Sequence, residues 1–288
     1  MNVRETPRAV ARSVEWEFAQ STYAPVLGEV PAALFPCWAQ SARQEFPGIP
    51  RDASFYAQSA EGLMMFFDCA AAAGKTCGLP SRAADSVWHA WARLDAAGLD
   101  AFCIRHFGRA FPHVERAHMQ KGEMGRALAV CLVQARRRAS QPAAGSHLPR
   151  LFSLDSQLGM PRGFGYRIIG GLVACSTLDD FGNPEAKVSY PKELTPYGLY
   201  LEGLVSETEY QEAVRLARIP DLRTATADSA NGGVVLGTAL AGDRVCGDGD
   251  GVCGDGDSGG GDSGGGDGGS ACGGGCGGGC GGGGGCGS

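Results

Sequence analysis

The chain has 288 residues and a formal net charge of −6, but its composition is divided into two unlike parts. Residues 242–288 contain 26 glycines, seven aspartates, one arginine and no aromatic residue, so this segment accounts for the whole net charge. Residues 1–241 then hold 24 basic and 24 acidic groups. A balanced body with an acidic tail lacks the basic surface that a nucleic-acid partner requires, which excludes that class of partner.

The amino-terminal stretch alternates charged and apolar residues and lacks the apolar core of a secretion signal. The longest apolar runs extend over about a dozen residues, short of the roughly 20 that a membrane span needs. We therefore predict a cytoplasmic protein with no membrane partner. The 12 cysteines are then expected to be reduced thiols or metal ligands instead of disulfides.

Residues 1–140 predict a helical domain. One or two helices are expected before residue 50, followed by a helix over 55–73 that stops at Gly74. Ser81 is a candidate N-cap for a helix that ends near Gly98, and a shorter helix ends near Gly108. A further helix covers 124–139, where three terminal arginines suit the negative end of the helix dipole.

Residues 141–222 predict a linker, a small β-hairpin and a final helix. The stretch 140–150 has linker composition, and the Gly-Gly pair in "RIIGGLVACSTL" is typical of a hairpin turn. Ser206 and Glu209 form a capping box for a helix over about 206–219, which Pro220 ends. Residues 223–288 predict a disordered tail rich in glycine, aspartate and cysteine. The fold class is mainly α, a helical bundle carrying one possible hairpin.

Two glycine-containing stretches fail as nucleotide-binding motifs. "AAGKT" at 72–76 has Cys69 where a phosphate-binding loop needs glycine, and it follows a helical pattern. "GFGYRIIGG" lacks the third glycine of a dinucleotide fingerprint.

The segment 85–119 holds four of the five histidines and Cys103. A thiolate with imidazoles is a competent zinc set, so His89, Cys103 and His113 are candidate ligands. His89 is also a candidate acid or base, with Asp85 one turn earlier orienting its imidazole. The alternative is structural: the aromatic residues and Cys103 form core, the histidines hydrogen-bond within the bundle, and Asp85 is a first-turn acid.

This segment resembles an uncharacterised family of bacterial proteins and, more distantly, the glycine-rich domain-containing proteins of plants. The resemblance covers residues 75–115 best and implies an architecture without a reaction. Leu99 and Val114 stand where the pattern has an aromatic residue and a histidine. The matching residues are Pro80, Ser81, Asp85, Val87, Trp88, His89, Phe102, Cys103, Phe107, Gly108, Arg109, Phe111 and His113.

A second resemblance lies in "LEGLVSETEYQEAVRLAR", which is similar to short carboxy-terminal helical modules. Modules of that kind are regarded as interaction or oligomerisation elements.

The tail leaves several chemistries open. Its aspartates lack the aliphatic and glutamate positions that calcium repeats and EF-hands need. Four thiols, Cys272, Cys276, Cys280 and Cys286, can wrap a soft ion such as zinc or copper. The same Gly-Cys runs resemble the precursors of heterocycle-containing peptides, and the remaining alternative is a flexible tail without a ligand.

The sequence favours a non-enzymatic cytoplasmic interaction protein with an unidentified protein partner. No cofactor is predicted outright. The alternatives are a protein that binds zinc or copper through the tail cysteines, an enzyme that uses His89, and the precursor of a modified peptide.

Overall fold

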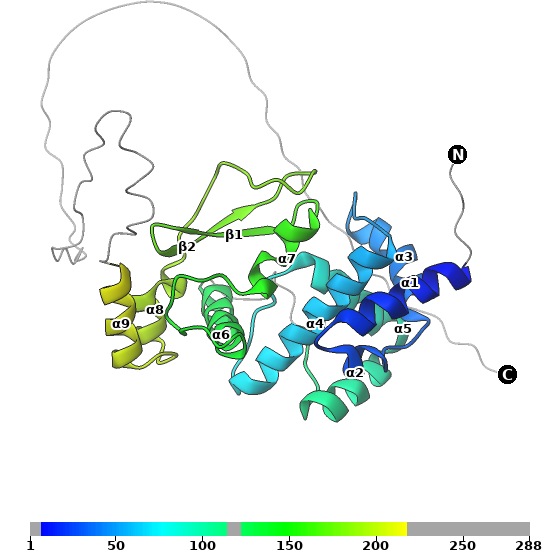
Figure 1. Ribbon diagram of the computed structural model, residues 1–288, viewed down its shortest axis with the longest axis horizontal. Coiled ribbons are helices and arrows are strands. Elements are labelled where there is room, and N and C mark those ends of the chain that lie inside the picture. The colour runs from blue at the N-terminus through cyan, green and yellow to red at the C-terminus, as the bar shows by residue number, and fades with distance from the viewer. Residues whose placement is uncertain (1–6, 114–121, 218–288) are drawn as a thin grey trace, which may run out of the picture. The chain divides into compact units, whose positions relative to one another are not determined.

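The computed structural model describes residues 7–113 and 122–217, with side chains from residue 11 onward (Figure 1). These residues all belong to one compact unit, Met1–Ser229. The tail predicted over 223–288 lies outside the described residues, and the predicted domain limits stay predictions. The elements are, in chain order, α1 (Pro7–Gln20), α2 (Ala24–Leu27), α3 (Leu34–Glu45), α4 (Ala53–Ala73), α5 (Arg82–Phe107), α6 (Glu123–Arg138), α7 (Arg150–Leu158), β1 (Phe164–Ile169), β2 (Leu172–Thr177), the 3₁₀ helix η2 (Lys192–Leu194), α8 (Pro196–Leu201) and α9 (Glu207–Ala217).

The prediction of a mainly helical fold with one hairpin is confirmed for the described ranges. β1 and β2 pair antiparallel, with Ile169 opposite Leu172. The turn between them is Gly170–Gly171, and both residues have positive φ, a conformation that glycine adopts without strain. No helix in these ranges combines the length and apolar character needed to cross a bilayer.

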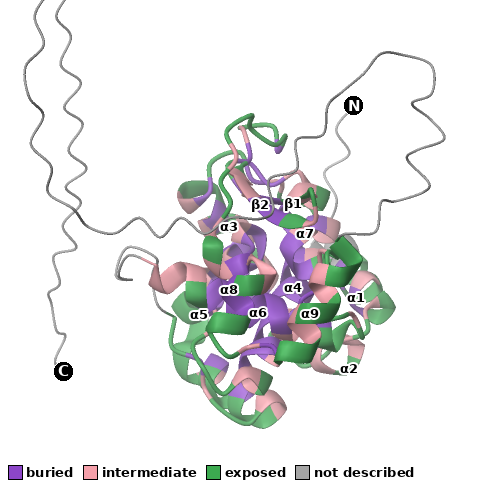
Figure 2. Cartoon of the chain, turned by 90° about the vertical axis from the view of Figure 1, so that its left-hand side faces the viewer, coloured by how far each residue is buried: buried purple, intermediate pink, exposed green. Residues whose placement is uncertain are grey.

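Helix α4 is the centre of the bundle, and Figure 2 shows it as a buried element beside α6. It packs against α1, α5, α6 and α7, because apolar residues surround it on nearly every side. The Asp52 carboxylate caps its start by accepting a hydrogen bond from the amide of Phe55. Gly74, at φ 61°, ends it as predicted.

Helix α5 carries the candidate residues Asp85, His89 and Cys103, and its start is fixed by two sets of hydrogen bonds. The Ser81 hydroxyl accepts a hydrogen bond from the Ala84 amide, which confirms the predicted N-cap. The Asp155 carboxylate, from α7, accepts hydrogen bonds from the Ser81 hydroxyl and the Arg82 and Ala83 amides. The first turn of α5 is therefore anchored to α7.

The sequence predicted two helices over 83–108, and the structure has one element with an internal break. Asp95 has φ −163° and ψ 89°, outside the helical region. Its carboxylate accepts a hydrogen bond from the Gly98 amide at 2.8 Å, as an N-cap does. The interruption therefore lies three residues before the predicted helix end, at the residue able to cap the second segment.

The stretch 140–150 is not an exposed linker. Ala143 and Ala144 are buried there. Arg136 is 2 % exposed, and its guanidinium donates hydrogen bonds to the carbonyls of Ala143 and His147. Burial lowers the pKa of Arg136 to about 10. A buried cation needs such partners, so this segment folds over the end of α6 to supply them.

Candidate metal centre

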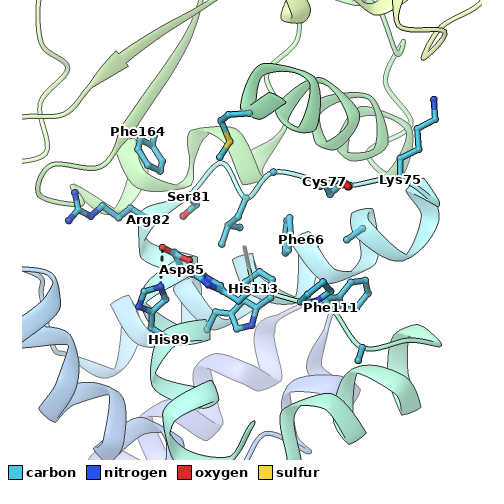
Figure 3. A pocket seen from close by; sticks show the side chains of 18 of the residues that line it. Phe66, Lys75, Cys77, Ser81, Arg82, Asp85, His89, Phe111, His113 and Phe164 are labelled. Atoms are coloured by element: carbon cyan, nitrogen blue, oxygen red, sulfur yellow. Dashed lines mark hydrogen bonds and ion pairs between the residues drawn. The ribbon is translucent and has the colours of Figure 1, made fainter. Parts of the chain in front are cut away.

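A pocket of about 870 Å³ opens beside the first turns of α5 (Figure 3). Its walls come from α3, α4, α5, the starts of α6 and β1, and the loops that flank α5. Phe66, Trp88, Phe111 and Phe164 supply apolar surface, and the polar side chains of the site line one part of it. A mostly apolar pocket with a few convergent polar groups is the usual form of a small-molecule site.

Asp85, His89 and His113 converge in this pocket. One ligand atom from each lies within 4.8 Å of the other two. The Asp85 Oδ1 atom lies 2.9 Å from Nε2 of His113, and Asp85 Oδ2 lies 3.7 Å from Nε2 of His89. Figure 3 shows the two imidazoles on either side of the carboxylate. Among the described residues, this is the one group of three side chains placed to hold a metal ion.

The backbone explains how two of these residues share a face. Asp85 and His89 are four residues apart on α5, so their side chains point the same way along the helix. Because Ser81 and Asp155 fix the start of α5, both residues have a defined position relative to the pocket.

His113 reaches the same point from the segment after α5. Gly108, at φ 82°, ends α5 and turns the chain back. The Arg109 guanidinium then donates a hydrogen bond to the Ala70 carbonyl, and the Phe111 ring stacks on Phe67 with centroids 5.2 Å apart. The imidazole of His113 meets the Trp88 ring edge-on at 4.6 Å. Packing against α4 and α5 therefore sets the direction of this side chain.

A second carboxylate, Glu45 at the end of α3, holds the other nitrogen of His89. Its Oε2 atom lies 2.9 Å from His89 Nδ1, and Arg93 forms an ion pair with Oε1. Partial burial raises the pKa of Glu45, but the hydrogen bonds from Arg93 and His89 outweigh it and lower the pKa below its usual value. Glu45 is thus an ionised acceptor that orients the His89 ring.

The remaining sequence candidates lie elsewhere. Cys103 is 1 % exposed in the core, where burial, with a smaller effect of Asp100, raises the pKa of its thiol to about 12. The structure does not bring Cys103 to the Asp85 group. The tail thiols Cys272, Cys276, Cys280 and Cys286 lie outside the described residues, so their ligand role stays a prediction.

Sequence reasoning grouped His89 and His113 with Cys103 as zinc ligands and gave Asp85 the separate role of orienting His89. It missed Glu45. This residue lies 44 positions before His89 in a different helix, and no local motif marks it. The pocket itself also gave no sequence signal, since its walls come from segments far apart in the chain.

Comparison with known proteins identifies a family for this chain but no individual relative. A model of the UCP032817-like family matches residues 38–185, which include α4, α5, the hairpin and all four residues of the candidate site. No curated protein and no solved structure matches the chain. The family description names no reaction, ligand or partner, so the geometry of the site has to carry the functional argument.

Proposed function

We propose that this chain, which belongs to the UCP032817-like family, binds one divalent transition-metal ion through Asp85, His89 and His113. The observation that carries the proposal is the convergence of three ligand atoms within 4.8 Å beside an open pocket. Imidazole nitrogens and a carboxylate oxygen suit zinc and its neighbours among the divalent ions. Zinc is the ion we name for the test.

The separations of the ligand atoms support this ion size. A tetrahedral zinc ion with bonds of about 2.0–2.2 Å holds its ligand atoms about 3.3 Å apart. The Oδ1 atom of Asp85 lies 2.9 Å from Nε2 of His113, its Oδ2 atom lies 3.7 Å from Nε2 of His89, and one ligand atom from each of the three residues lies within 4.8 Å of the other two.

The arrangement around His89 is that of a metal ligand with an orienting partner. When one imidazole nitrogen is held by a carboxylate, the other is directed at the ion and becomes a better donor. Glu45 holds Nδ1 of His89, and Nε2 faces Asp85. The ion pair between Arg93 and Glu45 keeps that carboxylate in place.

Three protein ligands leave an open position on a four-coordinate ion, and this is the composition of catalytic zinc sites. Here that position would face the pocket, where the aromatic walls can hold the apolar part of a small molecule. We therefore assign a metal-dependent role on a small-molecule ligand as the function that the geometry supports best. The interaction role expected from the sequence stays a separate prediction.

The test is zinc affinity in the full-length chain with all six tail cysteines changed to serine, so that the tail thiols do not compete. We expect one bound ion. His113→Ala or Asp85→Asn should weaken binding by roughly 100-fold or more, and Glu45→Gln by roughly 10-fold to 100-fold, as loss of an orienting partner does. Competition with a chromophoric zinc indicator measures each affinity.

His106→Gln is the matched control. His106 lies on the same helix and 3.1 Å from its own carboxylate partner, Glu29, but does not line the pocket. Its substitution should leave zinc affinity unchanged. Folded Asp85→Asn and His113→Ala proteins that bind zinc as tightly as the parent would overturn the proposal.

A further inference from the structure

Three cysteines from three separate elements meet behind one wall of the same pocket. Cys69 lies on α4, Cys77 in the loop before α5, and Cys131 on α6. Contact with the thiols of Cys69 and Cys77, together with burial, raises the pKa of Cys131, so the Cys131 thiol lies beside both of them. Cys131 and Cys69 are 0 % and 2 % exposed, whereas Cys77 is half-buried and lines the pocket.

The backbone holds this thiol cluster, Cys69, Cys77 and Cys131, in place. The amide of Gly78 donates a hydrogen bond of 2.9 Å to the carbonyl of Ala127, one helical turn before Cys131. A Cβ atom at Gly78 would lie 3.1 Å from the Leu128 backbone nitrogen, which is closer than ordinary van der Waals contact. Glycine therefore lets this loop lie directly against the backbone of α6. Packing of α4 on α6 brings in Cys69.

We propose that Cys77 and Cys131 bind one Cu(I) ion, with Cys69 as a supporting thiol. Thiolates select soft ions, and Cu(I) accepts as few as two sulfur ligands. On binding, two S–H protons pass to solvent and two Cu–S bonds form, with no change of oxidation state. Cys77 supplies the route of entry, because it is the member of the cluster that reaches the pocket.

The composition of the site argues against zinc. A structural zinc site takes four ligands, and a catalytic one takes three with an open position. Within the described ranges, the one set of three mutually close ligand atoms is the Asp85 group, so the three thiols do not form a closed triangle. A two-thiol site made of Cys77 and Cys131 fits the low coordination number of Cu(I) better.

A regulatory disulfide is the competing use of a thiol pair. Disulfide exchange needs a thiolate as the attacking group. Contact with the thiols of Cys69 and Cys77, followed by burial, raises the pKa of Cys131, so its thiol stays protonated near neutral pH. That slows exchange, whereas a strongly bonding soft ion displaces the proton. The third thiol is also superfluous for a disulfide.

The site is independent of the proposed zinc site. Figure 3 shows Cys77 apart from Asp85 and His89 on the pocket wall, with Phe66 between them in this view. The two sites differ in ligand class, since one offers nitrogen and oxygen and the other sulfur alone. Failure of either proposal therefore leaves the other standing.

The test measures Cu(I) affinity, under anaerobic reducing conditions, in the full-length chain with its six tail cysteines changed to serine. Competition with a chromophoric Cu(I) chelator should show one tightly bound ion. Cys77→Ser and Cys131→Ala should each weaken binding by roughly 100-fold or more because each removes a thiolate ligand, and Cys69→Ser by less than about 10-fold. Copper X-ray absorption should show sulfur ligands only.

Two controls keep the result specific. Cys103→Ser alters a buried thiol outside the cluster, and His113→Ala alters the zinc site, so neither should change Cu(I) affinity. Cys77→Ser changes a half-buried residue and keeps the test valid if Cys131→Ala unfolds the protein. Unchanged Cu(I) affinity in a folded Cys77→Ser protein overturns the proposal. A protein that forms a Cys77–Cys131 disulfide in air, and that binds no copper after the disulfide is reduced, overturns it too.

Discussion

Asp155 joins three elements through one carboxylate. It is 1 % exposed and accepts hydrogen bonds from the Ser81 hydroxyl and from the amides of Arg82, Ala83 and Phe164. Burial raises the pKa of Asp155 overall, and these four hydrogen bonds lower it in part. The residue links α7 to the start of α5 and to β1, and so fixes the helix that carries Asp85 and His89.

Asp155→Asn should therefore be strongly destabilising although it preserves the shape of the side chain. Its NH₂ group would replace an oxygen that accepts two hydrogen bonds, leaving two buried donors unpaired. At about 1–3 kcal/mol for each, we expect a loss of roughly 2–6 kcal/mol in the free energy of unfolding. Denaturant titration measures it, with exposed Asp180→Asn as the control. A loss under about 0.5 kcal/mol, typical of surface changes, would contradict this role.

At the scale of single residues, the sequence identified Asp85, His89 and His113 as candidates but did not predict that all three side chains meet at one site. Asp85 and His89 could be paired in advance because helical spacing puts them on one face. The sequence also grouped His113 with His89 and predicted the helix end near Gly108. The contact of His113 with Asp85 depends in addition on packing against α4, which no local pattern encodes. Cys103 also has helical spacing with His106, but its side of α5 faces the core, as 1 % exposure shows.

The break inside α5 gives a prediction at the scale of the element. Asp95 is exposed and caps the segment that begins after it, by accepting a hydrogen bond from the Gly98 amide. Asp95→Ala should lower the free energy of unfolding by about 1 kcal/mol, the usual value of an N-cap. Asp100→Ala, an exposed acid within the same segment, is the matched control. Equal effects of the two substitutions in denaturant titrations would show that Asp95 is no cap.

Elements marked by local chemistry were predictable. Gly74 ends α4, Gly170 and Gly171 form the hairpin turn, and the Ser206–Glu209 capping box starts α9, with the Ser206 amide donating to Glu209 at 2.7 Å. Each signal acts within a few residues, so the sequence displays it directly.

Elements set by tertiary contacts were not predictable. Helix α7 was missed because its flanking composition is that of a linker, and three of the four donors to its Asp155 lie more than 70 residues away. The turn after α6 supplies carbonyl acceptors to the buried guanidinium of Arg136. Because Arg136 is one of three consecutive arginines at the end of the helix, the sequence gave no sign that it is buried. In both segments, hydrogen bonds to a buried polar side chain decide the course of the chain, and no sequence pattern marks their partners.

At the scale of the whole molecule, charge and core belong to different parts of the sequence. The described core consists of residues between Val14 and Val205 and includes aromatic side chains from α3, α4, α5 and α7. Residues 242–288 contain no aromatic residue and carry the entire net charge. A segment of that composition has too little apolar surface to offset its own ordering entropy, so it should contribute little to the stability of the body.

A chain that ends at residue 241 tests this separation. Its formal net charge rises from −6 to zero, because seven aspartates and one arginine are removed, so its isoelectric point should move well above 5.4. Its thermal midpoint should stay within about 2 °C of the full-length value, since no core residue is lost. Isoelectric focusing and calorimetry measure the two quantities on the same samples. A midpoint lowered by about 5 °C or more, with the expected isoelectric shift, would mean that the tail stabilises the body despite its composition. Bound metal would then be the first cause to examine. Repeating the comparison in the chain whose six tail cysteines are changed to serine would test it.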